Sequence, residues 1–446
     1  RVGGTWRENS YPGAACDVPS HLYSFSFEQN PTWTRAFSPQ REILDYLESC
    51  ADKYGIRPAI RFGFAVRSAR FDAATGRWTI HASDGRIVSA RALVLGNGAL
   101  HVPAYPDIPG LASFTGKCFH SAAWDPTFDP RGQRIGLIGT GASAIQIVPE
   151  IAGLASKLHV FQRSPAWVMP KPDHTITPRA RSLYARIPAL QRLVRSAIYW
   201  QLEVRALGFS RPQILKLAEP VVRRYIAAKV HDPALRAALT PNYRMGCKRI
   251  LLSNTYYPAL QRPGVEVVTA GIERIEPTGV RTRDGTLREL DALVLGTGFR
   301  VNEYLSSIEI TGPDGRELNT TWQGNPGAYL GITVAGFPNL FLLMGPNTGL
   351  GHNSMIFMIE AQARYTLQCI QLLRSRGLKS IAVRPEVQEA FNAELQTRLQ
   401  RSVWASGCNS WYQGDNGRNS ALWPGFTVDY WRRTRRVKLE DFTLRA

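Results

Sequence analysis

One stretch of the chain, residues 135–144, limits the fold more than any other. It reads Ile-Gly-Leu-Ile-Gly-Thr-Gly-Ala-Ser-Ala, an apolar strand that runs into a helix through glycines. Gly139 allows a tight turn, Gly141 lets the backbone approach a pyrophosphate, and Ala144 keeps helix and strand close. The helix N-terminus adds free N–H groups and the positive end of its dipole. We therefore expect the residues of this turn to bind dinucleotide phosphates: Gly139, Thr140, Gly141, Ala142 and Ser143.

The residues after the next strand bear on the ribose end of the dinucleotide. The strand is expected over 157–161, and Gln-Arg-Ser follows it. A site for NAD usually carries an acid here for the ribose 2′-hydroxyl, whereas an arginine suits a 2′-phosphate. Arg163, with Ser164 beside it, therefore favours NADPH over NADH. The alternative interpretation of Arg163 is an exposed loop residue.

An internal repeat indicates a second domain of the same kind. Ala-Leu-Val-Leu-Gly-Asn-Gly at 92–98 returns as Ala-Leu-Val-Leu-Gly-Thr-Gly at 292–298, and an Asp-Gly turn precedes each copy at the same offset. Each copy is typical of a hairpin, a buried strand and a glycine turn. Two unrelated buried strands with glycine ends are the alternative. The shared offset favours two similar dinucleotide-binding domains, each closed by the same strand.

Bulk properties exclude several functional classes. The length of 446 residues allows two or three domains. No apolar run approaches the length of a membrane-spanning helix. The six cysteines lie far apart without a CxxC pair, which argues against zinc or a redox dithiol and is typical of a reducing cytoplasm. We expect no metal site and a cytoplasmic location.

The net charge of +19 has two interpretations. It is typical either of proteins that meet nucleic acid or an anionic membrane, or of solvated arginine faces that attract anionic cofactors. No nucleic-acid motif accompanies the charge, so we expect no nucleic-acid partner. Much of the charge falls in 173–245, where apolar residues recur at helical spacing. This segment is expected to be a helical insertion, either a soluble lid over the active site or a surface in weak peripheral contact with a membrane.

Coarse periodicity places the other elements. A helix is expected over 39–56, strands over 59–67, 78–82, 329–334 and 337–344, and a long helix from Met355 with Asn353 and Ser354 as candidate N-caps. The glycine-rich aromatic loop at 411–425 either covers the cofactors or packs the C-terminus.

Two motifs carry a resemblance to a known family. Phe114-x-Gly116-xxx-His120-xxx-Trp124-Asp125 resembles the fingerprint of Baeyer–Villiger monooxygenases, the class B flavin-dependent enzymes that include cyclohexanone and 4-hydroxyacetophenone monooxygenases. Gly-Gly-Thr-Trp at 3–6, followed by Tyr-Pro-Gly at 11–13 and Asp17, resembles a second motif of that family, which wraps the flavin. The resemblance covers nearly the whole chain.

The resemblance implies an α/β fold with two Rossmann-like domains, for FAD and NADP, and a helical insertion. It assigns 1–103 with 297–446 to the FAD domain, 104–172 with 246–296 to the NADP domain, and 173–245 to the insertion near the substrate pocket. It also implies a strand–GxGxxG–helix unit for FAD ahead of Gly3, which this sequence does not contain. A truncated chain, a misassigned start and a lost FAD site are the three interpretations.

The resemblance further implies the reaction. NADPH would reduce FAD, and O₂ would form a C4a-peroxyflavin that converts a ketone or other lipophilic substrate, giving an ester or lactone from the ketone. Met-Gly-Cys-Lys-Arg at 245–249 matches a family segment in which Lys248 binds the 2′-phosphate and Arg249 is catalytic, paired with Asp17. His120 is expected to link domain movement. The FAD contacts implied are Gly4, Thr5, Trp6, Asp17, Tyr23, Val66, Gly96 and Asn353.

Two alternatives to this reaction stay open at the level of the sequence. The first is oxygenation at nitrogen or sulfur, which needs no catalytic arginine. The second is a flavin-free protein that binds NADP(H) alone or no cofactor.

Overall fold

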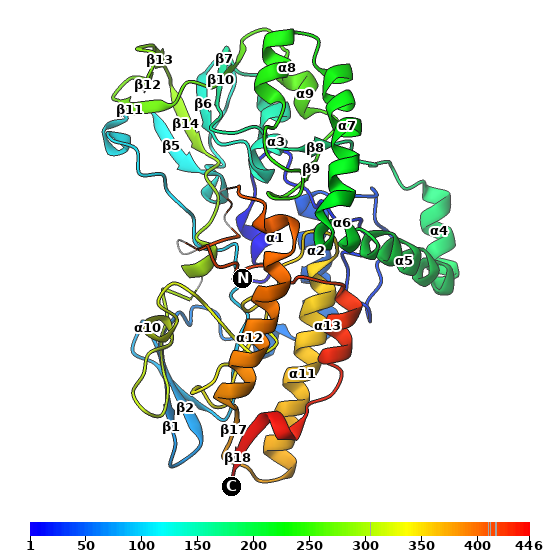
Figure 1. Ribbon diagram of the computed structural model, residues 1–446, viewed down its shortest axis with the longest axis vertical. Helices are drawn as coiled ribbons and strands as arrows, with labels where there is room; N and C mark the ends of the chain where they lie inside the picture. The colour runs from blue at the N-terminus through cyan, green and yellow to red at the C-terminus, as the bar shows by residue number, and fades with distance from the viewer. Residues whose placement is uncertain (304, 409, 411, 415–416) are drawn as a thin grey trace.

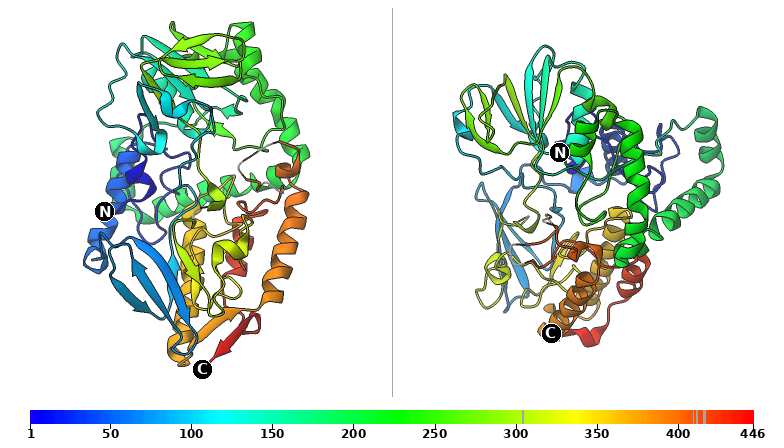
Figure 2. Two further views of the ribbon diagram at one scale, coloured as in Figure 1. Left: turned by 90° about the vertical axis from the view of Figure 1, so that its left-hand side faces the viewer. Right: turned by 45° about the horizontal axis from the view of Figure 1, so that its top comes forward.

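Two sheet-bearing lobes stand one above the other, and a helical arm projects from their side (Figure 1). This computed structural model describes residues 1–303, 305–408, 410, 412–414 and 417–446. The two further views show the same two lobes, and the right-hand one again shows the projecting arm (Figure 2). None of the described helices is long and apolar enough to cross a bilayer.

The upper lobe is built on a five-stranded parallel sheet with the order β10-β7-β6-β14-β5. Its strands are β5 (Lys117–His120), β6 (Arg134–Ile138), β7 (Lys157–Phe161), β10 (Val265–Val268) and β14 (Ala292–Leu295). Helices α3 (Ala142–Ile151) and α9 (Tyr256–Leu260) pack together over it, and a three-stranded meander of β11 (Ile272–Glu276), β12 (Gly279–Thr282) and β13 (Leu287–Glu289) adjoins it. Continuous apolar strands such as β6 and β14 are typical of a sheet covered on both faces.

The lower lobe combines a mixed four-stranded sheet with long helices. The sheet has the order β15-β1-β2-β3, from β1 (Val66–Asp72), β2 (Arg77–Ala82), β3 (Ile87–Ala90) and β15 (Glu309–Thr311). Its helices are α10 (Leu318–Trp322), α11 (Met355–Ser375), α12 (Pro385–Gln400) and α13 (Thr427–Arg433), and β17 (Ser380–Val383) pairs with β18 (Phe442–Arg445). The α11 register buries Met358, Ala361, Tyr365, Cys369 and Leu373 on one face.

The two copies of the sequence repeat fold as strands in different surroundings. Strand β14 lies between β6 and β5 and is buried throughout. Strand β4 (Leu93–Leu95) pairs only with β16 (Leu340–Leu342) among the described residues, and its Val94 is 40% exposed where Val294 is fully buried. The place that β6 takes beside β14 has no described counterpart beside β4.

The arm and the helices behind it come from the basic segment. They are α4 (Pro178–Arg186), α5 (Pro188–Glu203), α6 (Ala206–Ser210), α7 (Pro212–Lys229) and α8 (Pro233–Leu239). All five lie within 173–245, the segment expected to be helical. Proline at the first or second position of α4, α5, α7 and α8 suits a helix start, because the N–H that proline lacks has no intrahelical partner there. The domain boundaries themselves stay a prediction.

Some expected elements are placed differently in the structure. Helix α2 (Gln40–Lys53) ends earlier than expected, and the strand expected over 59–67 is wrong, because β1 begins only at Val66 and a 3-10 turn occupies Arg57–Ala59. Pro58 favours this turn, since it removes a ladder donor. The strand expected over 329–334 is a tight turn closed by the isolated bridge Tyr329↔Thr333.

The remaining elements are short. They are α1 (Thr5–Glu8), β8 (Val168–Met169), β9 (Leu251–Leu252) and 3-10 turns at Leu111–Ser113, Ser121–Ala123, Val301–Glu303, Val403–Ala405 and Leu439–Asp441.

Candidate active site and dinucleotide site

The glycine turn predicted to hold phosphates lies at the end of β6. Gly139 has φ of 119°, and a Cβ there would collide with the carbonyl oxygen of Gly296. Gly141 caps α3, and a Cβ added to it would have no atom within 4 Å. Gly141 and Ala142 are exposed, so the first N–H groups of α3 face open space. This end of a ten-residue helix fits a pyrophosphate.

The residues expected at the 2′-phosphate meet beside this turn. Lys248 Nζ donates to Ser164 Oγ at 2.9 Å, and Thr140 Oγ1 donates to the Ser164 carbonyl at 2.9 Å. Burial and the neighbouring charge of Arg163 lower the pKa of Lys248. Arg163 is exposed, and no acid is paired with either cation among the described residues. Two close, uncompensated cations fit a dianionic phosphate.

Arg249 and Asp17 form the ion pair that the motifs imply. Arg249 donates to Asp17 Oδ2 from Nε at 3.1 Å and from Nη2 at 2.5 Å, and both side chains are about one-third exposed. Burial opposes ionisation of Asp17, but the charge and hydrogen bonds of Arg249 outweigh it, so the pKa of Asp17 lies below its ordinary value. Asp17 in turn raises the pKa of Arg249. A permanent cation is therefore held at this position with its charge partly balanced.

Two residues near this pair were missed at the level of the sequence. The ammonium of Lys171 is a second cation that lowers the pKa of Asp17, and it lies 5.0 Å from the ring of Phe37. Tyr412 is buried. Burial raises its pKa to about 12, although the nearby charge of Arg249 acts to lower it. No motif marks Lys171, and Tyr412 lies in the C-terminal loop whose Trp411, Asp415 and Asn416 are outside the described residues.

The loop expected to wrap the flavin is docked onto the NADP helix. Tyr11 Oη donates to Gln146 Oε1 at 2.9 Å, and Gln146 Nε2 donates to the Ala15 carbonyl at 2.9 Å. Trp6 Nε1 donates to Tyr23 Oη at 3.1 Å, with the two rings edge to face. The turn that carries Gly4 and Thr5 opens α1, and Gly4 has φ of 50°. These bonds hold the loop that carries Asp17 against α3.

Of the fingerprint residues, His120 lies at the join between the lobes. His120 is fully buried at the end of β5, and its ring lies 5.6 Å from Tyr105 and 5.8 Å from Phe299. Those two rings belong to the two segments that cross between the lobes, and the role of His120 in domain movement stays a prediction. Trp124 packs on Phe119, whereas Phe114 lies in the core of the meander.

The remaining two fingerprint residues, Gly116 and Asp125, make local contacts. A Cβ at position 116 would collide with the carbonyl oxygen of Asp291. Hydrogen bonds from Lys117 and then from Thr127 lower the pKa of the half-buried Asp125 carboxyl to about 2.

Three predicted FAD contacts have mixed surroundings. Val66 begins β1, and Gly96 is exposed just after β4 with open space at its Cβ position. Asn353 is buried before α11, where its Nδ2 donates to Glu203 Oε2 at 2.7 Å and its Oδ1 accepts from the Ser354 N–H at 2.8 Å. The side chain of Asn353 is thus already engaged within the protein. A flavin contact there would have to come from backbone.

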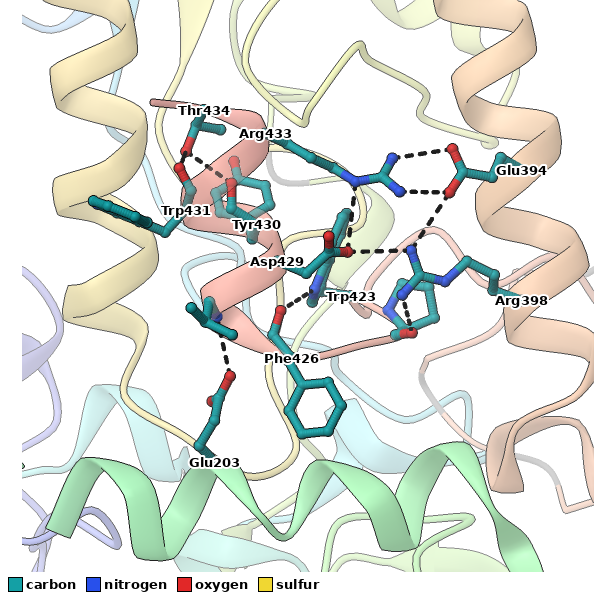
Figure 3. A network of polar contacts seen from close by, with 12 residues as sticks. Glu203, Glu394, Arg398, Trp423, Phe426, Asp429, Tyr430, Trp431, Arg433 and Thr434 are labelled. Carbon is teal, nitrogen blue, oxygen red and sulfur yellow. Dashed lines mark hydrogen bonds and ion pairs between the residues drawn. The ribbon is translucent and has the colours of Figure 1, made fainter. Parts of the chain in front are cut away.

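A polar face of α5 attaches the insertion to two segments, residues 21–30 near the N-terminus and the start of α13. Gln191 Nε2 donates to the Asn30 carbonyl, and Arg195 Nη1 donates to the carbonyls of residues 21, 22 and 24. One and two turns later, Tyr199 Oη bonds with Thr427 Oγ1 and Glu203 Oε1 accepts from the Val428 N–H at 3.0 Å. Figure 3 shows Glu203 reaching the start of α13.

The neighbouring contacts lock α12 to α13. The guanidinium groups of Arg398 and Arg433 lie 5.5 and 5.8 Å from the ring of Trp423, and Glu394 pairs with both (Figure 3). The end of α5 is therefore docked onto a rigid part of the lower lobe.

A disulfide joins the arginine segment to the C-terminal loop. Cys247 and Cys408 are bonded, with their Cα atoms 6.2 Å apart and a sequence separation of 161. The spacing of the cysteines did not indicate this pair, because sequence distance says nothing about proximity in the fold. Because disulfides are typical of oxidising compartments, this bond argues against the reducing environment that the cysteine pattern indicated.

The described residues fit NADP(H) and the flavin end of FAD. The exposed α3 N-terminus and the Lys248–Ser164 pair would hold NADP(H). Ser354 Oγ, buried at the N-terminus of α11, has no hydrogen-bond partner, so it is free to meet a flavin. Beside β4, no described strand carries a second phosphate turn.

Comparisons with known proteins agree on one group. A family model described as flavin-binding monooxygenase-like matches residues 21–207. A Baeyer–Villiger monooxygenase of Pseudomonas aeruginosa is 48% identical over 99% of this chain and 85% of its own length, and one of Streptomyces coelicolor is equally similar. A steroid monooxygenase bound to NADP is 33% identical with a TM-score of 0.89, and it covers 100% of this chain and 93% of its own.

Proposed function

Because the chain belongs to the Baeyer–Villiger monooxygenases, which use NADPH and FAD to turn ketones into esters or lactones, we propose which of its residues carry that reaction. When bound, NADPH supplies the hydride, and FAD with O₂ supplies the oxygen that enters the ketone. The residues below bind, orient and polarise these partners.

We propose that the end of β6 selects NADPH. The α3 N-terminus binds the pyrophosphate, while Lys248, Arg163 and Ser164 bind the 2′-phosphate. The 2.9 Å hydrogen bond of Lys248 to Ser164 orients the ammonium before the cofactor arrives. This arrangement supports discrimination against NADH, because removal of the phosphate would leave two cations uncompensated.

Arg249 is the proposed catalytic residue, and Asp17 is its positioning residue. A guanidinium keeps its charge at every working pH, so it can balance negative charge that develops on the oxygen atoms of the reacting ketone. Both hydrogen bonds of the pair end on one oxygen, Oδ2, so the Nη1 side of Arg249 is left to the substrate. The single observation that carries this proposal is the Arg249–Asp17 pair beside the dinucleotide turn.

The proposed substrate is a lipophilic ketone that reaches the site beneath the helical insertion, with O₂ as co-substrate. The weak peripheral membrane contact expected of the insertion belongs to this proposal. The FAD contacts expected of residues 4–6, Asp17 and Tyr23 also belong to it, since these residues share the loop that is docked on α3.

The test is product analysis with the purified chain, added FAD, NADPH and a ketone such as cyclohexanone. The account predicts the lactone in proportion to the NADPH consumed. A flavin-loaded protein that consumes NADPH and releases only hydrogen peroxide with every ketone tried would overturn it.

A further inference from the structure

Helix α5 is amphipathic in the reverse of the usual sense. Its polar face (Gln191, Arg195, Tyr199, Glu203) is the face that contacts the protein, as the hydrogen bonds above show. A helix on a soluble domain normally turns its apolar stripe inward. Leu202 is buried with this polar face, whereas the apolar side chains on the opposite side of α5, Leu193 and Trp200, point outward.

The outward face is strongly apolar and continues along the chain. Leu193 and Trp200 on α5 are 66% and 56% exposed, and Val204 follows at 59%. On α7, Leu217 and Val221 are 80% and 64% exposed and lie one turn apart. Nine of the nineteen large exposed apolar residues of the described chain fall in this part: Leu183, Ile187, Leu193, Trp200, Val204, Leu207, Ile214, Leu217 and Val221. Monomeric proteins rarely leave such a concentration uncovered.

The same helices carry an unbalanced positive charge. Between residues 178 and 231 there are eleven lysines and arginines and two acids. Glu203 is buried, and Glu219 pairs with Arg244, so neither offsets the surface. Four exposed cations on α5 and α7, or at their ends, have no acid partner among the described residues: Arg192, Arg211, Lys216 and Arg224.

We propose that the outer surface of α4 to α7 docks on an anionic lipid membrane. Apolar side chains would enter the interface while the cations meet lipid phosphates, as in interfacial amphipathic helices. The arm of α4 and α5 projects from the body in Figure 1 and in the right view of Figure 2, so a flat surface can reach it. A lipophilic ketone dissolved in that membrane would be delivered next to the insertion.

Charge decides between a membrane and a second copy of the chain. Two copies that met through this surface would bring together two positive, unpaired sets of cations, which repel at physiological salt. An anionic bilayer offers the opposite sign over an extended plane.

The test is flotation of the full chain with vesicles of phosphatidylcholine, alone and mixed with phosphatidylglycerol. The account predicts binding to the mixed vesicles that weakens with added salt. Leu217→Glu combined with Val221→Glu should reduce the partition coefficient at least about tenfold, and Lys216→Glu or Arg224→Glu about fivefold or more each. The matched controls are Ile87→Glu and Arg70→Glu, exposed positions in the lower lobe, which should leave binding unchanged.

Quenching of tryptophan fluorescence by brominated lipid locates the contact, because the quenched fraction of the fluorescence should fall in Trp200→Phe. Absence of binding to the mixed vesicles would overturn the proposal. Equal losses in the control variants would also overturn it. Light scattering that shows a dimer broken by the Leu217–Val221 double variant, without lipid binding, would assign the surface to a second copy instead. None of these readouts depends on monooxygenase activity, so failure here leaves the proposed reaction untouched.

Discussion

Arg249 and Asp17, which lie 232 residues apart in sequence, meet through two hydrogen bonds to a single carboxylate oxygen. Asp17 ends the loop that is docked on α3, and Arg249 follows the lysine that meets Ser164. One ion pair thereby joins the loop expected to wrap the flavin to the segment expected to bind NADP. Because the reaction needs both cofactors at one point, we propose that this pair marks it.

Asp17→Asn should change the acid side of the stability curve. The pKa of Asp17 is lowered in the folded state, so the pair stabilises the fold above the ordinary carboxyl pKa and loses this contribution as pH falls through the lowered value. We expect the variant to be less stable than the wild type from pH 5 to 8, by about 1 kcal/mol because the pair is partly exposed. The difference in the free energy of unfolding between the wild type and the variant should disappear below about pH 4. Urea unfolding at several pH values checks this, and a gap that widens in acid would contradict it.

Lys248→Ala should impair NADPH far more than NADH. A hydrogen bond to a charged phosphate contributes about 1.5–3 kcal/mol, so KM for NADPH should rise about 10- to 150-fold. KM for NADH should barely move, since NADH has no 2′-phosphate. Lys157→Ala, an exposed lysine at the start of β7, is the control. Steady-state kinetics with both nucleotides decide, and a parallel loss for both would contradict the assignment.

The sequence predicted the elements with local chemistry and missed those set by contacts between distant segments. The glycine turn at 139–141 and the preference of Arg163 for a 2′-phosphate follow from patterns in which each residue has a stated physical role. Lys248 and the Arg249–Asp17 pair were indicated only by the family resemblance. Lys171 and Tyr412 have no such pattern, because only folding brings them to Asp17. The Cys247–Cys408 bond was missed for the same reason.

The sequence also did not indicate that the polar face of α5 contacts the protein. Its apolar spacing predicted a helix correctly, but periodicity does not say which face meets the protein. The face that carries Glu203 contacts the protein, because a buried carboxylate that accepts several hydrogen bonds is costly to leave unpaired. The strand expected over 59–67 failed because the propensity of β-branched and aromatic residues there was outweighed by Pro58 and Gly63.

Cys408→Ser should destabilise the chain through the lost cross-link. A disulfide that closes a loop of this length contributes about 2–5 kcal/mol by restricting the unfolded state. The C-terminal loop should also loosen over Arg249, so ester formation should fall along with the melting temperature. Cys118→Ser is the control, since Cys118 is exposed and free. Calorimetry under oxidising and reducing conditions checks this: the reductant should lower the wild-type Tm and leave Cys408→Ser unchanged.

Glu203→Gln should loosen the insertion from the lower lobe. The new amide would place donors against Asn353 Nδ2 or the Val428 N–H, and each buried group left without a partner costs about 1–3 kcal/mol. Hydrogen exchange should rise in α5 and at the start of α13, and more NADPH should be consumed without product. Glu289→Gln breaks an exposed ion pair with Arg134 and should change stability by less than about 1 kcal/mol. Unchanged exchange in α5 would contradict this role of Glu203.

The most direct test compares wild type and Arg249→Ala, both loaded with FAD, on a ketone and on a thioether. Sulfur is attacked by an electrophilic oxygen and needs no cation, whereas the ketone reaction places negative charge beside Arg249. We predict that Arg249→Ala lowers ester formation at least about 100-fold and retains sulfoxide formation, while Arg249→Lys gives an intermediate rate of ester formation. Ester formation by Arg249→Ala at the wild-type rate would contradict the account.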